Sequence, residues 1–342
     1  MLKGAIIGFG KIARSSHLDA YLNSSLNKRA KIVAAVEPVI SNYQNGKNEF
    51  PDIKFYSTID ELLDKEEIDF VDITCPPTYH YDVMKKCVDR NIHILCEKPF
   101  TLNLQEAESI QNTIKSSGIV FMPCHQYKYS PVWMNFKKFI GEQNGSHRVL
   151  AQFNIFRLQA DPGLESISAK WRTSSFQQGG GILIDTGIHY LYLANWMLGK
   201  PFKVTSNLTT LSHSDYNCED TATIILESEK GVAQITVTWA ADKRHNDARV
   251  VCANGSLNYE SGNKMLKSTA SGNEEIIVPD ASEKSHYSSL YVNMFTEFFD
   301  AVENKKQNKE WIDEAYQSIL LLDQCYKSSE LNNLNVKYEQ QI

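Results

Sequence analysis

The sequence lacks long apolar runs, basic clusters and an apolar leader, and each absence excludes a class of protein. Apolar runs such as residues 118–124 fall far short of the ~20 residues that span a membrane. A net charge of −6 without any Lys/Arg cluster excludes the basic surfaces that bind nucleic acid or anionic membranes. Met1 leads straight into a strand-like run, so we expect no secretory signal peptide.

Cysteine is present but follows no pairing pattern. The chain has seven cysteines, an odd number, and none is in C-x-x-C spacing, which excludes the usual zinc signatures and argues against a disulfide framework. Several lie in apolar strand runs, where a thiol behaves as a small hydrophobe. We therefore expect a protein of the reducing cytoplasm.

The first 124 residues alternate between short β-branched runs and helix-like stretches. A chain of 342 residues is long enough for about two domains, because single cores stop growing at roughly 250–300 residues. Near-continuous apolar strands separated by helices indicate a parallel sheet covered on both faces, so we expect a doubly wound Rossmann domain over residues 1–124. Thr58 and Glu61 form a capping box. The expected strands are 4–7, 31–36, 70–74, 92–96 and 119–121, and the expected helices are 12–23, 58–64, 79–90 and 104–116.

After residue 124 the strand-like runs become longer and lie closer together. Strands gathered in one region and helices in others predict an α+β domain with a large, mainly antiparallel sheet over residues 125–342. The polar stretch 261–284 is expected to be loop around one short strand, 275–278. The other expected strands are 148–158, 203–211, 221–226, 232–240, 248–253 and 256–259, and the helices are 185–198, 290–304 and 312–329.

A glycine motif lies where the first strand gives way to a helix. Gly8, Gly10 and Ala13 have G-x-G-x-x-A spacing, which permits a tight turn, close approach of a pyrophosphate and close helix packing. Glu37 ends the second strand, where a carboxylate accepts hydrogen bonds from ribose hydroxyls and repels a 2′-phosphate. Residues 38–41 hold no Arg or Lys, so NAD is expected rather than NADP. The loop residues Phe9, Lys11 and Ile12 complete the expected cofactor contacts.

Two further strands end in residues suited to the cofactor crevice. Cys75 and Pro76 follow one strand, with His80 directly after them, facing either the nicotinamide or a loop carbonyl. Glu97 and Lys98 end the next strand, where a lysine can hold a substrate hydroxyl and stabilise its developing negative charge. The alternative for this Glu–Lys pair is an ordinary surface ion pair.

Asp185 and His189 interrupt an apolar helix that follows three glycines, in the run GGGILIDTGIH. Side chains at i and i+4 share one face of an α-helix, so the carboxylate and the imidazole point the same way. A buried carboxylate is expensive unless it is paired, which favours a general base and a second polar group facing a substrate. The alternative is a helix cap at Asp185 and a hydrogen-bonded core histidine.

As a set, these motifs resemble the Gfo/Idh/MocA family of nicotinamide-dependent oxidoreductases. The resemblance rests on GFGKIA at 8–13, E-K-P at 97–99, GGGILIDTGIH at 179–189, and the strand, prolines and histidine of 71–80. It implies a Rossmann domain followed by a domain whose open sheet mediates homodimers or homotetramers. It also implies that Lys98, Asp185 and His189 meet over the nicotinamide, where His189 or Lys98 takes the hydroxyl proton and no metal is required.

Substrate recognition is where the chain departs from this resemblance. The family's Asn-x-Arg-Phe-like stretch corresponds to HQYKYSP at 125–131, in which Lys128 replaces the usual Arg, so bidentate contacts are not assumed. Interdomain packing is the alternative role for each candidate. The candidate substrate contacts are His125, Tyr127, Lys128, Trp171 and Arg172, together with Lys98, Asp185 and His189.

The sequence thus predicts an NAD-dependent dehydrogenase or reductase. Its expected partner is a small molecule, the secondary alcohol or ketone of a sugar, a sugar derivative or an inositol-like cyclitol. One alternative is a nucleotide-sugar dehydrogenase, or a reductase of a diol or pyrrole-type compound, on the same scaffold. Another is a non-catalytic NAD-binding sensor, which would not need Lys98, Asp185 and His189 together.

Overall fold

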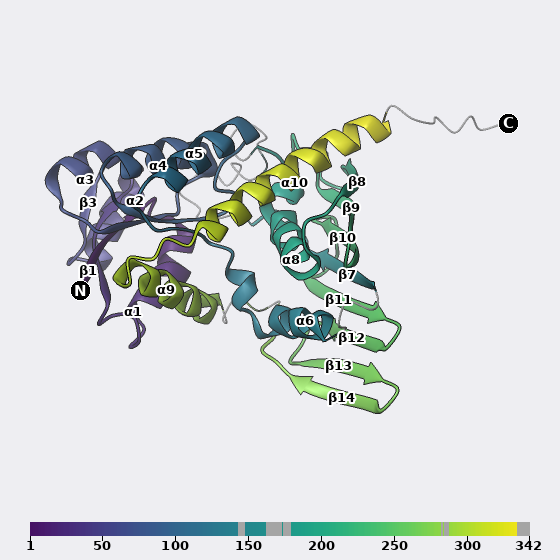
Figure 1. Cartoon of the computed structure of the whole chain (residues 1–342). Helices are drawn as coiled ribbons and strands as arrows, with labels where there is room; N and C mark the ends of the chain where they lie inside the picture. Colours follow the sequence, from purple (N-terminus) through teal and green to yellow (C-terminus); the bar gives the residue numbers. More distant parts are fainter. Residues whose placement is uncertain (143–147, 162–172, 174–178, 282, 284–286, 334–342) are drawn as a thin grey trace. The chain divides into compact units, whose positions relative to one another are not determined.

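The computed structural model divides the chain into two compact units that alternate along the sequence (Figure 1). It describes residues 1–142, 148–161, 173, 179–281, 283 and 287–333. The first unit comprises Met1–Ser130, Asp161–Gly179 and Glu283–Ile319, and the second comprises Pro131–Ala160, Gly180–Ser282 and Leu320–Ile342. The continuous domain limits expected from the sequence, 1–124 and 125–342, stay a prediction.

Six parallel strands form the sheet of the first unit, in the order β3-β2-β1-β4-β5-β6. This order confirms the expected doubly wound sheet, whose strand order reverses between β1 and β4. Ligands of such sheets bind at that point, outside the carboxyl ends of the strands. The strands are β1 Leu2–Ile7, β2 Ala30–Val36, β3 Lys54–Tyr56, β4 Phe70–Ile73, β5 His93–Cys96 and β6 Phe121–Pro123.

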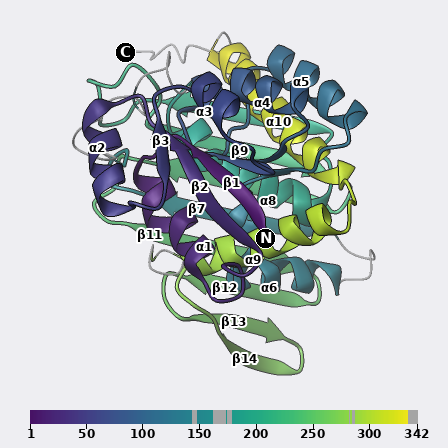
Figure 2. The ribbon, with the colours of Figure 1, turned by 90° about the vertical axis from the view of Figure 1, so that its left-hand side faces the viewer.

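Helices cover both faces of this sheet, with α3, α4 and α5 on one face and α1 and α9 on the other (Figures 1 and 2). The expected cap at Thr58 is confirmed, because its Oγ1 accepts the N–H of Glu61 at 3.2 Å, whereas Glu61 Oε2 accepts the N–H of Ser57, one residue before the cap, at 3.4 Å. The helical segments are η1 Ala13–His17, α1 Leu18–Leu22, α2 Ile40–Glu49, α3 Ile59–Lys65, η2 Pro77–Tyr79, α4 His80–Asp89, α5 Leu104–Ser116, η3 Gln126–Tyr129 and α9 Tyr287–Glu303.

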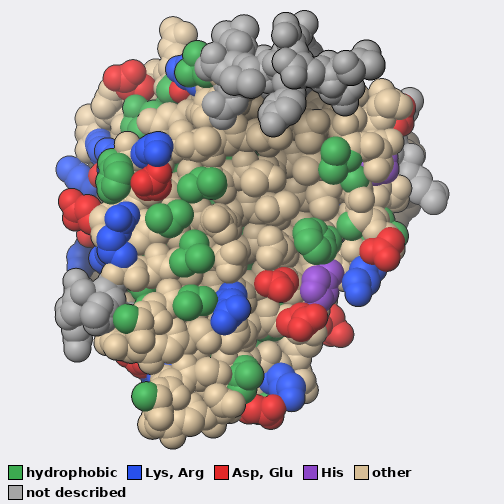
Figure 3. Space-filling model, turned by 90° about the vertical axis from the view of Figure 1, so that its right-hand side faces the viewer, with side chains coloured by type: hydrophobic (Ala, Val, Ile, Leu, Met, Phe, Trp, Pro, Cys, Tyr) green, Lys and Arg blue, Asp and Glu red, His purple; other side chains and the backbone are tan. Residues whose placement is uncertain are grey.

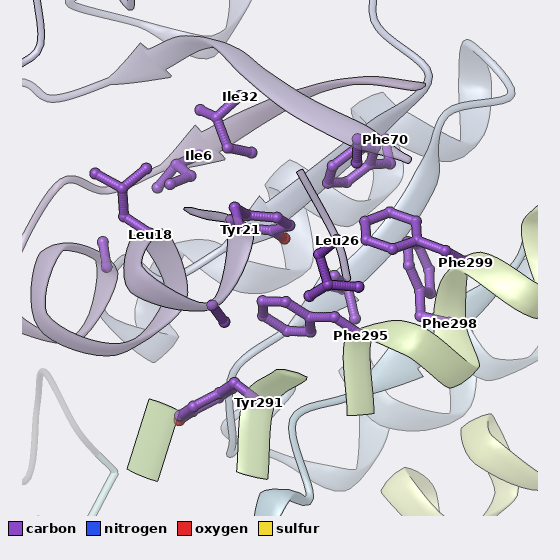
Figure 4. Close-up of a cluster of buried hydrophobic side chains, with 14 of the residues drawn as sticks. Ile6, Leu18, Tyr21, Leu26, Ile32, Phe70, Tyr291, Phe295, Phe298 and Phe299 are labelled. Atoms are coloured by element: carbon purple, nitrogen blue, oxygen red, sulfur yellow. The ribbon is translucent and has the colours of Figure 1, made fainter. Parts of the chain in front are cut away.

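Helix α9 completes the core of the first unit from far along the chain (Figure 4). Its Phe295 stacks on Tyr21 of α1 with ring centroids 4.8 Å apart, and its Phe299 meets Phe70 of β4 edge-on at 5.2 Å. The helix expected over 290–304 therefore forms, and its aromatic face packs against α1 and β4.

The second unit contains an eight-stranded sheet in the order β14-β13-β12-β11-β7-β10-β9-β8. Only the β7–β10 pair is parallel among its described pairings, which confirms the expected, mainly antiparallel sheet. The strands are β7 Val149–Phe156, β8 Lys203–Thr209, β9 Thr221–Ser228, β10 Gly231–Thr238, β11 His245–Cys252, β12 Gly255–Glu260, β13 Lys264–Thr269 and β14 Gly272–Ile277.

Helices α6 (Pro131–Gly141) and α8 (Ile188–Leu198) pack against one face of this sheet. Trp133 of α6 lies 5.7 Å from Tyr190 of α8 and 5.8 Å from Phe153 of β7, measured between ring centroids. Buried and half-buried residues alternate along β7, as expected for a sheet with one covered face. In Figure 3, hydrophobic side chains are scattered among polar and charged ones and do not form a single patch.

The short strand expected at 275–278 forms as the end of β14, but the expectation of loop over the rest of 261–284 is wrong, because β13 and β14 form a hairpin there. The hairpin lies at the edge of the sheet, and β14 is almost entirely exposed, so its polar composition resembles that of a loop.

Helices α2 and α6 and strand β3 are further elements that were not predicted from the sequence. Helix α2 is rich in Asn and contains Gly46, which are poor helix formers, so its sequence carries a weak helical signal.

Helix α10 (Lys309–Asn333), expected over 312–329, begins in the first unit and ends in the second. In the second unit its serines cover the edge strand β8, because Ser328 Oγ accepts the N–H of Ser206 and Ser329 Oγ accepts that of Leu208. Such bonds satisfy backbone groups that an open edge would leave exposed. Within the described residues, no helix combines the length and the apolar character required to cross a membrane.

Candidate active site

The glycine loop after β1 needs glycine at two positions for different reasons. Gly8 has a φ of +94°, and a Cβ there would lie 2.6 Å from the Cα and the N of Cys75, so the fold itself requires glycine. A Cβ on Gly10 would meet no heavy atom within 4 Å. Protein packing therefore does not demand glycine at Gly10, whereas close approach of a pyrophosphate does. The loop fits the dinucleotide expected from the sequence.

Glu37 joins this loop to the segment before α2. Its Oε2 accepts the N–H of Phe9 at 3.0 Å, and its Oε1 accepts the N–H of Val39 at 2.9 Å. Burial raises the pKa of Glu37, and hydrogen bonds from Val39, Phe9 and Asn42 oppose the rise. Backbone donors thus fix the carboxylate beside the glycine loop, and its contact with a ribose stays a prediction.

The remaining loop residues divide between core and surface. Ala13 is fully buried, as close packing of the helix requires, and Ile12 is half-buried. The Lys11 ammonium lies 3.1 Å from Asp161 Oδ1, in the same unit. Contacts of Lys11 and Ile12 with a cofactor stay predictions.

His80 connects the loop after β4 to the turn after β5. Its Nε2 lies 2.8 Å from the carbonyl oxygen of Cys75, and its Nδ1 lies 2.9 Å from that of Pro99. Burial lowers the pKa of His80 and raises that of the Cys75 thiol to about 12. These distances favour the loop-carbonyl alternative for His80. Pro76 directly precedes η2, and contacts of Cys75, Pro76 and His80 with the nicotinamide stay predictions.

Glu97 is part of a buried polar network, not of a surface ion pair. His17 lies between two carboxylates, with Nδ1 2.8 Å from Asp72 Oδ2 and Nε2 3.0 Å from Glu97 Oε1. The Tyr21 hydroxyl donates to Asp72 Oδ2 at 2.9 Å, and the Tyr291 hydroxyl donates to Glu97 Oε1 at 2.8 Å. The other oxygen of Glu97, Oε2, accepts the backbone N–H of the next residue, Lys98, at 3.1 Å.

In this network, the opposite charges of His17 and Glu97 each favour the ionised form of the other. Burial by itself lowers the pKa of His17, but the charge and hydrogen bond of Asp72 and then those of Glu97 outweigh it and raise the pKa to about 9. Burial likewise favours neutral Glu97, but His17, Lys98 and Tyr291 together lower its pKa. At neutral pH, His17 is therefore an imidazolium that donates to two carboxylates.

Cys124 completes a group of potential metal ligands with His17 and Glu97, whose donor atoms lie within 4.8 Å of one another. A metal ligand must offer a lone pair, so histidine binds metals in its neutral form. Because both ring nitrogens of His17 donate protons to carboxylates, the arrangement suits an imidazolium better than a metal ion.

The candidate substrate residues near η3 contact the start of α10. Lys128 Nζ lies 2.8 and 2.7 Å from the two carboxylate oxygens of Glu314, and His125 Nδ1 lies 4.0 Å from Glu314 Oε2. Burial, followed by the charge of Lys128, holds the pKa of His125 well below its usual range. Tyr127 is buried. Contacts of these residues with a substrate stay predictions, as do those of Trp171 and Arg172, which lie outside the described residues.

The glycine run of the second unit packs against protein groups. A Cβ on Gly180 would lie 1.9 Å from the Tyr326 hydroxyl, and one on Gly181 would lie 1.9 Å from the carbonyl oxygen of Glu219. The Glu219 carboxylate accepts the N–H groups of Gly181 and Leu183 at 3.0 and 3.1 Å, and the Tyr326 hydroxyl at 3.1 Å. Glu219 and Tyr326 thus hold the start of the helix that carries Asp185.

Asp185 lies in a π-helical turn, η5 (Leu183–Gly187), which leads directly into α8. Neither segment has a side-chain cap, so Asp185 is not the helix cap considered from the sequence. Its Oδ2 accepts the Thr186 hydroxyl at 3.3 Å. His189 is buried, and its Nδ1 lies 2.9 Å from the Tyr192 hydroxyl. π-Helical turns inside α-helices are frequent at functional sites.

Lys98 belongs to the first unit, and Asp185 and His189 belong to the second. Their meeting over a nicotinamide stays a prediction.

Five residues that support the candidate site were not predicted from the sequence: His17, Asp72, Tyr291, Glu219 and Tyr326. One signal was present, because Asp72 interrupts the apolar strand FVDIT and a buried carboxylate needs a partner.

Comparison with known proteins assigns both parts of the chain to one family. Residues 2–125 match the family described as "Oxidoreductase family, NAD-binding Rossmann fold". Residues 148–258 match the "GFO/IDH/MocA C-terminal domain". These two matches account for more than half of the chain.

Individual relatives act on sugars and cyclitols, at low identity. The scyllo-inositol 2-dehydrogenase (NADP(+)) IolW of Bacillus subtilis is 24% identical over 60% of this chain and 54% of its own length. The D-apiose dehydrogenase of Paraburkholderia graminis is 26% identical over 68% of this chain and 59% of its own. The match to the first three curated relatives spans about half of their lengths, 54%, 55% and 54%.

Solved structures share the fold over nearly the whole chain. Levoglucosan dehydrogenase, in complex with NADH and levoglucosan, matches with a TM-score of 0.84 at 19% identity, covering 96% of this chain and 97% of its own. This structural match covers residues of both units, including segments that the two family matches leave out. The chain belongs to the Gfo/Idh/MocA family of oxidoreductases, with an NAD-binding Rossmann fold in its N-terminal part.

Proposed function

We propose that this protein is an NAD-dependent dehydrogenase or reductase acting on a secondary alcohol or ketone of a sugar, a sugar derivative or a cyclitol. The observation that carries the proposal is Lys98 at the carboxyl end of β5, with its backbone N–H held by buried Glu97. Ligands of doubly wound sheets bind outside the carboxyl ends of the strands, so the position of Lys98 after β5 suits a residue that contacts a ligand. Family membership and the sugar and inositol dehydrogenases among the relatives support the same reaction class.

Each candidate residue has a definite chemical task in this proposal. The Lys98 ammonium binds the reacting oxygen and stabilises its negative charge, as a preorganised donor does in other oxyanion sites. Asp185 orients the same hydroxyl. His189 accepts its proton as the C–H hydride leaves, or Lys98 does so as a neutral amine in place of the ammonium, and the reverse transfer serves ketone reduction. The glycine loop and Glu37 would hold the dinucleotide, which would supply the hydride acceptor for oxidation or the hydride donor for reduction.

The preference for NAD over NADP is part of the proposal. Glu37 places a carboxylate beside the glycine loop, and residues 38–41 offer no basic side chain to a 2′-phosphate. Some relatives use NADP, including the inositol dehydrogenase of Bacillus subtilis, so cofactor choice needs a direct measurement. We expect a higher kcat/KM with NAD than with NADP.

A nucleotide sugar is the less favoured substrate. Its diphosphate would need cationic side chains, and Lys128 is engaged by both carboxylate oxygens of Glu314. This ion pair compensates the charge of Lys128, and the other basic candidate, Arg172, lies outside the described residues. Neutral polyols need no such charge.

An activity screen tests the proposed function. Purified protein is mixed with NAD or NADP and a panel of aldoses, ketoses, anhydrosugars and inositols, or with NADH or NADPH and the corresponding ketones, and NAD(P)H absorbance is followed. We expect turnover on at least one polyol with NAD. NADH binding without turnover on any member of the panel would favour the sensor alternative.

We also propose homodimers or homotetramers formed through the face of the second unit's sheet that α6 and α8 leave uncovered (Figure 3). Half-buried Leu150 and Phe156 of β7 lie on that face among polar residues. Light scattering after size-exclusion chromatography measures the assembly.

A cytoplasmic location is also part of the proposal. It is consistent with the seven cysteines, which are all thiols.

A further inference from the structure

We propose that His17 is a positioning residue for Lys98 and acts through Glu97. This inference rests on the proposed function, in which Lys98 holds the reacting oxygen. His17 lies on η1, directly after the glycine loop, whereas Glu97 and Lys98 directly follow β5. The imidazole therefore connects the cofactor loop to the strand end that carries the predicted catalytic lysine.

The connection consists of polar contacts between buried side chains. His17 and Asp72 are fully buried, and Glu97 is nearly so. His17 Nε2 donates to Glu97 Oε1 at 3.0 Å, and Glu97 Oε2 accepts the Lys98 backbone N–H at 3.1 Å. The Tyr291 hydroxyl donates to the same Oε1 at 2.8 Å. Two donors on Oε1 and one on Oε2 leave the carboxylate little freedom to rotate, which fixes the backbone at Lys98.

Stability alone gives a weak reason for such a network. Buried ion pairs often contribute no more than apolar residues of the same size, because desolvation offsets their attraction. Removing one partner is costly, because it leaves a buried charge unpaired. The network does impose one geometry on Glu97, and catalytic groups lose rate steeply when misplaced by about 1 Å.

The groups facing His17 give the network a net negative charge beside Lys98. Asp72 faces it from β4, Glu97 from β5, Tyr21 from α1 and Tyr291 from α9, with the Cys124 thiol following β6. Two carboxylates and one imidazolium sum to −1, and the Lys98 ammonium in turn lowers the pKa of Glu97. Loss of the imidazolium would double the uncompensated negative charge next to Lys98.

Three variants test the connection, and one serves as a matched control. His17→Gln removes the charge, Glu97→Gln weakens the acceptor for the Lys98 N–H, and Tyr291→Phe removes one hydrogen bond while keeping every charge. His93→Gln is the control, because His93 lies on the same strand, β5, and its Nδ1 accepts the Val120 N–H. Tyr291→Phe keeps the test valid if His17→Gln does not fold.

The first readout needs neither cofactor nor substrate. Lysines are reductively methylated with ¹³C-formaldehyde, and the Lys98 signal is identified by its loss in Lys98→Arg. At pH 7 we expect this signal to move in His17→Gln, Glu97→Gln and Tyr291→Phe and to stay in His93→Gln. An unmoved Lys98 signal in all three folded variants would overturn the inference.

The second readout uses the polyol found by the activity screen. For His17→Gln we expect kcat to fall about 10- to 100-fold. We expect KM for NAD and the Kd for NADH to change less than about threefold, because the glycine loop keeps its contacts. Wild-type kcat in folded His17→Gln would contradict the inference while leaving the proposed function intact. If the wild type neither oxidises a polyol nor reduces a ketone of the panel, the proposed function fails, and the Lys98 signal still decides whether His17 positions Lys98.

Discussion

The carbonyl oxygen of Glu219 lies 1.9 Å from the point where a Cβ of Gly181 would be. The carboxylate of the same Glu219 accepts the backbone N–H groups of Gly181 and Leu183. One residue therefore excludes a side chain at the glycine and holds its backbone in place. The glycine run before Asp185 has a structural reason that the sequence motif alone did not reveal.

Gly181→Ala is expected to destabilise the second unit strongly. The new methyl would meet the backbone carbonyl of Glu219, which also accepts the N–H of Ile182 and cannot rotate away as a side chain can, so we expect a loss of about 3 kcal/mol or more in the free energy of unfolding. Gly180→Ala is the matched variant, because its methyl would meet the Tyr326 hydroxyl at the end of a side chain. Urea denaturation compares the two, and equal stabilities would contradict this account.

Gly10→Ala is expected to separate cofactor binding from folding. A Cβ at Gly10 meets nothing within 4 Å, so the melting temperature should change little. The methyl would occupy the space proposed for the pyrophosphate, so the Kd for NADH should rise at least about tenfold. NADH fluorescence titration measures the Kd. Gly8→Ala is the control and should lower the melting temperature, because its methyl meets the Cys75 backbone.

The sequence predicted the elements whose signals are local. Apolar strands, the Thr58 cap and the turn at Gly8 follow from periodicity, capping and backbone geometry, and each lies where it was expected. Of the hairpin β13–β14 only the end of β14 was predicted, because an exposed edge strand need not alternate apolar and polar residues. Its composition is therefore that of a loop.

Contacts between distant segments could not be read from the sequence. Nothing near Glu97 indicates that Tyr291, on a helix near the end of the chain, donates to its carboxylate. His80 had two possible partners, and only the fold places its ring against the Cys75 and Pro99 carbonyls. Motifs identify residue types suited to a reaction, whereas their supporting partners depend on the tertiary arrangement.

Stability is expected to fall at alkaline pH because of His17. Its folded-state pKa, about 9, exceeds the ordinary 6.5, so folding is linked to its protonation. The stabilisation is complete below about pH 6.5, worth roughly 3 kcal/mol, and is lost as the pH rises through about 9.

Urea denaturation of the wild type and His17→Gln from pH 6 to 10 isolates this effect from other titrating groups. The difference between their unfolding free energies should shrink across that range. A constant difference would show that His17 does not carry the linkage.

Lys98→Ala is expected to remove turnover and spare cofactor binding. Loss of a preorganised donor at a developing oxyanion costs about 100- to 1000-fold in kcat. The Kd for NADH should change little, because the glycine loop and Glu37 are held by their own contacts. Lys86→Ala is the matched control. Lys86 of α4 pairs with exposed Asp60 of α3, so the variant should keep wild-type kinetics. If Lys98→Ala retained wild-type kcat on the polyol identified by the screen, Lys98 would not be the group that holds the reacting oxygen.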